Sequence, residues 1–135
     1  MPRFVVLEHD HPFLHWDFLL EAGKTLRTWR LHARPDAGGV IAAEPLPDHR
    51  PVYLDYEGPV SGGRGEVKRW DAGEFAWTEG TSDQCTVTLT GRKLAGQACL
   101  RRVGTAHHST PSPRWVEGRS PPCNWEFVFT ADSVR

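Results

Sequence analysis

Glycine and proline interrupt this chain so often that a long helix has little room. The 135 residues include 13 Gly and 11 Pro. Gly weakens a helix through its backbone entropy, and Pro breaks one because it lacks the N–H. Between these interruptions the apolar residues alternate with polar ones or form short runs, and they do not recur at helical spacing. The pattern predicts an all-β protein.

Short segments with the character of strands follow one another along the chain. They cover residues 4–9, 15–21, 25–31, 40–43, 66–70, 74–78, 85–90, 97–103 and 125–130. Turn sequences at 22–24, 71–73 and 91–96 predict hairpins between neighbouring segments. We expect a small closed or nearly closed antiparallel β-barrel of about eight strands, because an open sheet of this length would expose long edges.

Two segments are expected to leave regular structure. Residues 44–51 contain three prolines, and residues 104–122 are rich in Ser, Thr, Pro and Gly. The second segment is predicted to be a long surface loop, in which His107 and His108 are solvated. The length favours a single domain over residues 1–135.

Bulk charge points to no class of partner. The chain has 16 Lys and Arg against 17 Asp and Glu. Local basic clusters are either solvated faces or phosphate-facing patches; they comprise Lys24, Arg27, Arg30 and Arg34, then Arg92, Lys93, Arg101 and Arg102. Three cysteines without C-x-x-C spacing fit reduced thiols in a cytoplasmic protein. The sequence predicts no signal peptide and no membrane span.

Three residues near the start form a candidate metal site. His15 and Asp17 lie two apart on a predicted strand and therefore share a face. His9 ends the preceding strand and can reach the same place. Two imidazoles and a carboxylate suit Mn²⁺, Zn²⁺ or Fe²⁺. A lone His is usually structural, but three His and an Asp within nine residues favour a metal or catalytic role. His11, before Pro12, is the weaker candidate.

The same alternation predicts where this site lies in the barrel. Trp16, Phe18 and Leu20 must point away from His15 and Asp17. We expect the apolar face to pack outward and the polar pair to point into the barrel mouth. A buried carboxylate there would need a partner or a metal to offset its desolvation.

His49 and Tyr53 form a second candidate group. His49 lies in the proline-rich bend, where a stiffened backbone can hold its ring in a fixed direction. Its imidazole could act as a general acid or donate to a phosphate oxygen, and Tyr53 offers a neutral hydroxyl donor. The alternative is a solvated His in a polar loop.

These motifs, in this order, resemble a known family. The chain carries HWDF-x-LE over 15–21, TW at 28–29, and DH followed by Y-x-DYEG over 48–58. WD-x-G follows over 70–73 and LTG-x-KL-x-G over 89–96, and 125–129 resembles a closing strand. Together they resemble the 3′-phosphoesterase domain of bacterial DNA ligase D and its free-standing relatives.

The resemblance implies a metal-dependent phosphoesterase of DNA repair. Such domains trim nucleic-acid 3′ ends, removing a terminal ribonucleoside and then the 3′-phosphate, usually with Mn²⁺. It implies that His9, His15 and Asp17 bind the metal. His49 and Tyr53 would contact the scissile phosphate, with His49 as the acid. A DNA ligase, polymerase or other end-joining protein on a separate chain is the implied partner.

The chain departs from the family motif at the phosphate contact. The family has Arg two residues after the motif Asp, where this chain has Leu19. Losing such a clamp removes a charge-assisted contact of roughly 1.5–3 kcal/mol, or about 10- to 100-fold. A family Lys is replaced by Ala33, and the segment 61–65 is short. Arg34 and Arg64 are the candidate substitutes for binding the substrate phosphate.

Two other functions use the same residues. His-x-Asp with a distant His is also the facial triad of non-haem iron oxygenases, although here His9 precedes the pair. The second alternative is a DNA-end-binding barrel that has lost catalysis along with the clamp Arg.

Overall fold

Nine antiparallel strands make up the part of the chain that this computed structural model describes, residues 2–103 and 124–132. The elements in chain order are β1 (Arg3–His9), β2 (His15–Ala22), β3 (Thr25–Leu31), β4 (Ile41–His49), the 3-10 helix η1 (Pro51–Leu54), β5 (Gly58–Pro59), β6 (Glu66–Gly80), β7 (Gln84–Gly91), β8 (Ala95–Arg102) and β9 (Trp125–Ala131).

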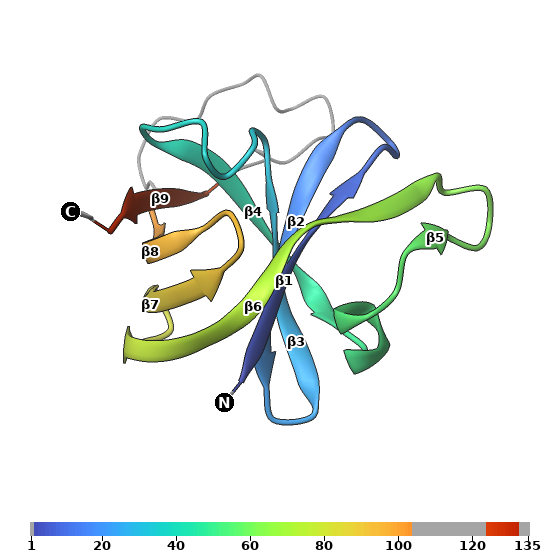
Figure 1. Cartoon of the computed structure of the whole chain (residues 1–135). Helices are drawn as coiled ribbons and strands as arrows, with labels where there is room; N and C mark the ends of the chain where they lie inside the picture. Colours follow the sequence, from blue (N-terminus) through green and yellow to red (C-terminus); the bar gives the residue numbers. More distant parts are fainter. Residues whose placement is uncertain (1, 104–123, 133–135) are drawn as a thin grey trace, which may run out of the picture.

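Eight of these strands close into a barrel. Their order is β1-β2-β3-β4-β9-β8-β7-β6, and β6 pairs again with β1 to complete the ring (Figure 1). The two-residue β5 adds to the free part of β6. Closure removes the exposed strand edges. The predicted antiparallel barrel is therefore confirmed.

Two apolar clusters lie on opposite faces of the barrel wall. The larger one draws buried residues from all eight barrel strands, including Phe18 and Leu20 of β2, so it fills the interior. The smaller one gathers residues of β1, β2, β3 and β6 on the outer face. Leu54 of η1 belongs to this outer cluster, as does Leu19 of β2. Segment β1–β2 is thus buried on both faces.

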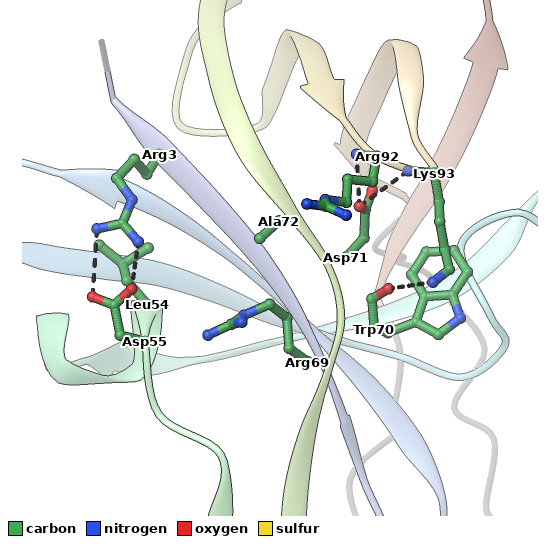
Figure 2. Close-up of a pocket in the computed structure, with 9 residues that line it drawn as sticks. All are labelled: Arg3, Leu54, Asp55, Arg69, Trp70, Asp71, Ala72, Arg92 and Lys93. Carbon is green, nitrogen blue, oxygen red and sulfur yellow. Dashed lines mark hydrogen bonds and ion pairs between the residues drawn. The ribbon is translucent and has the colours of Figure 1, made fainter.

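The prediction of a turn at residues 71–73 is wrong, because these residues lie within β6, a continuous strand of 15 residues. Asp71 does not make a local turn; its buried carboxylate accepts the backbone N–H groups of Arg92 and Lys93 at 2.9 and 3.0 Å (Figure 2). The N–H of Leu94 donates to its other oxygen at 2.8 Å. The Asp therefore caps the distant turn between β7 and β8.

Gly73 is explained by close packing. A Cβ at this position would lie 2.1 Å from the carbonyl oxygen of Thr90, closer than any side chain allows. The glycine lets β6 pass β7 at the start of their pairing, where Gly73 faces Gly91.

The prediction that residues 44–51 leave regular structure is also partly wrong. Strand β4 continues through Pro45 and Pro47 to His49, and only then does Pro51 begin η1. β9 pairs with β4 only from Ile41 to Ala43. The later part of β4 therefore has one free edge, where a proline removes no ladder hydrogen bond.

Some of the remaining predictions concern residues that the structure does not describe. Cys85 and Cys99 are free thiols, and burial raises the pKa of Cys85 to about 11. The predicted loop at 104–122, with His107 and His108, and Cys123 lie outside the described residues. In residues 2–103 and 124–132, no helix is long and apolar enough to cross a bilayer.

The cap made by Asp71 yields a stability prediction. In Asp71→Asn one carboxylate oxygen becomes an NH₂ group, which cannot accept from the turn. We expect a loss of about 1–3 kcal/mol in the free energy of unfolding, measured by urea denaturation. The matched control is Asp83→Asn, which breaks an exposed pair with Arg102 and should cost less than about 1 kcal/mol. Equal losses in the two variants would contradict the role of Asp71.

Candidate metal centre

The hairpin of β1 and β2 brings the three predicted ligands together. His9 and His15 are direct cross-strand partners, and Asp17 is the next residue on the same face of β2. One ligand atom from each side chain lies within 4.8 Å of the others. His15 and Asp17 are buried, whereas His9 is partly exposed. The pairing register therefore brings the three side chains to one place.

The three side chains do not point into the barrel mouth, and this part of the prediction is wrong. The alternation is as expected, because Phe18 and Leu20 lie opposite His15 and Asp17 on β2. However, the apolar pair faces the interior, which all eight strands fill with apolar residues. The polar pair is left on the outer face, beside the smaller cluster. In this barrel apolar side chains fill the interior, so the polar pair lies on the opposite face of the wall.

Backbone carbonyls fix which ring nitrogens are free. Nδ1–H of His15 donates to the carbonyl oxygen of Phe13 at 2.8 Å. Nε2–H of His9 donates to the carbonyl oxygen of Arg64 at 2.9 Å. A carbonyl only accepts, so each ring nitrogen in these bonds carries its proton. In the neutral rings, Nε2 of His15 and Nδ1 of His9 then carry lone pairs.

Both lone pairs lie beside the carboxylate of Asp17. Nε2 of His15 is 3.2 Å from one of its oxygens, and Nδ1 of His9 is 3.6 Å from the other. Nε2 of His15 and Oδ1 of Asp17 are buried without a hydrogen-bond partner among the described residues. Three acceptors that converge in this way can be satisfied by a bound cation, or by a proton on one imidazole. A histidine that donates its second N–H to a carbonyl is also typical of metal ligands, so these residues fit a divalent metal.

The charges at this site act on each other. The carboxylate of Asp17 raises the pKa of His9, and burial opposes this by less. Burial raises the pKa of Asp17, but the two imidazoles outweigh it and hold the pKa below the usual range. Asp17 is therefore an anion at neutral pH, as a metal ligand must be.

A short loop carries the carbonyl that orients His9. Val60 and Gly65 close this loop through a backbone hydrogen bond of 2.8 Å. Gly65 has a φ of +76°, and a Cβ there would lie 2.2 Å from the carboxylate of Asp10. That carboxylate accepts the N–H of Glu66 at 2.9 Å. Asp10 and Gly65 thus seat the loop against the metal site, a role that their positions in the sequence did not reveal.

A cavity of about 360 Å³ opens beside the triad. Its lining includes His9, Asp17, Arg30, His49 and Arg64. His49 therefore lies at the same site as the triad, although 32 residues separate it from Asp17. Nδ1–H of His49 donates to the carbonyl oxygen of Pro47 at 3.0 Å. This bond fixes the ring and leaves Nε2 for a ligand. His11, the weaker candidate, also lines the cavity.

Tyr53 of η1 lies next to His49, the last residue of β4. The two rings meet edge to face, with centroids 5.5 Å apart. Tyr53 lines a neighbouring cavity of about 260 Å³, which shares Val60 with the first. Tyr53 and His49 therefore form one continuous wall beside the metal site.

The two candidate arginines occupy different places. Arg64 lines the cavity, and its guanidinium donates to the carbonyl and hydroxyl oxygens of Ser61. Arg34 is exposed and forms a two-point ion pair with Asp36, at 2.7 and 3.2 Å. Its guanidinium also lies 5.8 Å from the ring centre of Trp70. The structure brings Arg64 to the site and places Arg34 elsewhere.

Arg30 is the residue that sequence reasoning missed. It lies on β3 directly across from Asp17 and lines the cavity. Sequence analysis placed Arg30 in a basic cluster, read as either a solvated face or a phosphate-facing patch, and did not connect it with the triad. The strand pattern could have found it, because Arg30 alternates with the interior residues Trp29 and Leu31. It must therefore point outward, toward the face that carries the triad.

A separate basic pocket of about 490 Å³ lies along β6. Figure 2 shows the guanidinium groups of Arg3, Arg69 and Arg92 around it. Arg3 is paired with Asp55 at 2.6 Å, and the carboxylate of Asp71 is occupied by backbone N–H groups. This pocket therefore offers cations but no free metal ligands.

Comparison with known proteins agrees with this geometry. The family model of the DNA ligase D 3′-phosphoesterase domain matches residues 7–102. The multifunctional non-homologous end joining protein LigD of Pseudomonas aeruginosa is 36% identical over 113 residues, which are 75% of this chain and 13% of that protein. The LigD of Mycobacterium tuberculosis is 29% identical over 140 residues, covering 97% of this chain and 18% of that protein. The chain thus spans only a small part of these relatives, and it belongs to the DNA ligase D 3′-phosphoesterase domain family.

Proposed function

We propose that this protein is a metal-dependent phosphoesterase that processes the 3′ ends of nucleic acid in DNA repair. The observation that carries the proposal is one cavity lined by His9 and Asp17 of the triad together with His49 and two arginines, with the buried His15 completing the triad behind it. A divalent cation, a proton donor and positive charge are the parts that phosphate ester hydrolysis needs.

The triad would hold the metal, with Mn²⁺ as the first candidate and Zn²⁺ or another divalent ion as alternatives. The bound ion would neutralise phosphate charge and lower the pKa of a bound water. Asp17 contributes the negative charge of the site, and the two imidazoles contribute neutral nitrogen ligands. The carbonyls of Phe13 and Arg64 hold those imidazoles in the tautomers that binding requires.

His49 would act as the general acid. Its Nδ1–H is engaged by Pro47, so in the cationic ring Nε2–H is the donor left for the leaving oxygen. The hydroxyl of Tyr53 would donate to a phosphate oxygen from the same wall. Arg64 would add positive charge at the cavity rim.

The names of the relatives suggest the biological setting. They are multifunctional end-joining proteins, and this chain corresponds to 13% and 18% of their lengths. We infer that it removes 3′-phosphates and terminal ribonucleosides from broken DNA ends. A ligase, polymerase or other end-joining protein on a separate chain would then use the ends.

A second candidate is a DNA-end-binding barrel without catalysis. Leu19 favours it, because this residue stands where the family motif has Arg and is fully buried in the outer apolar cluster. The non-haem iron oxygenase would use the same donor set, but membership of a phosphoesterase family favours hydrolysis.

Metal binding separates the roles of the two histidine groups. Loss of a residue that only supports a metal ligand typically weakens metal binding by about 10- to 100-fold. We expect His15→Ala, which removes a proposed ligand, to weaken Mn²⁺ binding by more than this. His49→Ala removes a ring that lines the cavity but is not part of the triad, so Mn²⁺ affinity should stay near that of the wild type. Isothermal titration calorimetry measures both. Equal affinity in His15→Ala and the wild type would reject the metal site.

Activity is tested on a 3′-phosphorylated primer–template. With Mn²⁺ the wild type should release phosphate, and EDTA or His15→Ala should abolish the release. His49→Ala should lower turnover by about 10²- to 10⁴-fold, as expected for the loss of a general acid. Tight binding of the DNA end without any metal-dependent release would instead establish the non-catalytic barrel.

A further inference from the structure

We propose that Arg30 of β3 is the clamp for the terminal phosphate, taking the place of the arginine missing at position 19. This inference rests on the proposed function, because it assigns the phosphate contact at the same site. It concerns a residue for which neither the sequence motifs nor the family match supplies a role.

The strand register places Arg30 where a clamp is needed. Asp17, Arg30 and Glu44 form one cross-strand row over β2, β3 and β4. Side chains of direct partners lie on the same face, with Cβ atoms about 4.5–5.5 Å apart. Arg30 thus neighbours the metal ligand Asp17 and lines the same cavity as His49. A phosphate bound in this cavity against His49 would lie within reach of its guanidinium.

The guanidinium has donors to spare. Its Nε is buried and has no hydrogen-bond partner among the described residues. Its closest acidic partner there is Glu44, at 3.7 Å from Nη1, a loose ion pair. The group also lies 5.4 Å from the ring centre of Phe13, which supports its plane from one side. A buried donor without a partner costs free energy, and two parallel N–H groups match the oxygens of a phosphate.

The other arginines near the site are less suited. Arg34 is held in a two-point pair with Asp36. Arg64 directs its guanidinium to Ser61 in its own loop. Among the arginines of the described residues, Arg30 combines a place in the cavity with uncommitted donors.

Leu19 and Arg30 together explain how the site can work without the motif arginine. Leu19 lies two residues after Asp17 on the same face of β2, and its cross-strand partner is Thr28. Positions 19 and 30 are therefore both neighbours of Asp17, one along the strand and one across it. Compared with the family motif, the positive charge lies on β3 instead of β2, and it is still next to the carboxylate of Asp17.

The test measures binding, with turnover prevented by EDTA. Two fluorescent oligonucleotides are compared by anisotropy, one with a 3′-phosphate and one with a 3′-hydroxyl. The wild type should prefer the 3′-phosphate. Arg30→Met keeps the apolar stem beside Phe13 and removes the charge, so affinity for the 3′-phosphate should fall by about 10- to 100-fold. Affinity for the 3′-hydroxyl should change little.

Arg101→Met is the matched control. Arg101 and Glu126 are also a direct cross-strand pair, at 3.1 Å, but they lie on β8 and β9, away from the triad. This variant loses the same charge and the same kind of ion pair, and should keep the wild-type preference. Arg30→Lys should fall between the wild type and Arg30→Met, because an ammonium cannot bind two oxygens side by side. Thermal unfolding checks that each variant is folded.

The outcomes separate this inference from the proposed function. If Arg30→Met keeps the wild-type preference for the 3′-phosphate, or if Arg101→Met loses it equally, the clamp is not Arg30. A wild type that binds both ends equally would overturn the inference as well. Phosphate release with Mn²⁺ is judged independently. A wild type that binds the 3′-phosphate through Arg30 but never releases phosphate would support the clamp and refute the enzyme.

Discussion

The pairing register between β1 and β2 is the constraint on which the site depends. Because His9 lies directly opposite His15, one hairpin delivers two imidazoles and the carboxylate of Asp17 to one place. A slip of one residue would turn every side chain of β2 to the other face. The barrel interior prevents such a slip, since it would expose Phe18 and Leu20, which are completely buried. Burial of apolar surface therefore fixes the geometry of a polar centre on the opposite face.

Backbone carbonyls complete what the register begins. The bonds from His15 to Phe13 and from His9 to Arg64 leave one lone pair of each neutral ring beside Asp17. The second bond depends on the loop that Gly65 allows to pass close to Asp10. The ligands are thus oriented by structure outside the triad, and they pay little conformational entropy when a cation binds.

The sequence was sufficient for the barrel and for the members of the triad, because both follow from alternation. It could not tell which face of β2 is interior, since Leu19 on the polar face is as fully buried as Phe18. Leu54 of η1 helps to cover that face, and it belongs to the same cluster as Leu19 although 35 positions separate them in the sequence. The sequence 71–73 has turn chemistry, but Asp71 uses it to cap a different turn. Local patterns identify side-chain partners poorly when the partner lies on a distant segment.

The proposed role of Arg30 bears on why Leu19 can stand where the family motif has an arginine. Burying a leucine on the outer face contributes about 1.5–3 kcal/mol, and Leu19 packs in the cluster that also holds Leu54 of η1. Since η1 also carries Tyr53 and follows His49, Leu19 strengthens the support of that wall. An arginine at position 19 would have to leave this cluster or bury its charge. If Arg30 binds the phosphate as proposed, Leu19 serves packing and Arg30, on the neighbouring strand, serves phosphate binding, so neither residue has to do both.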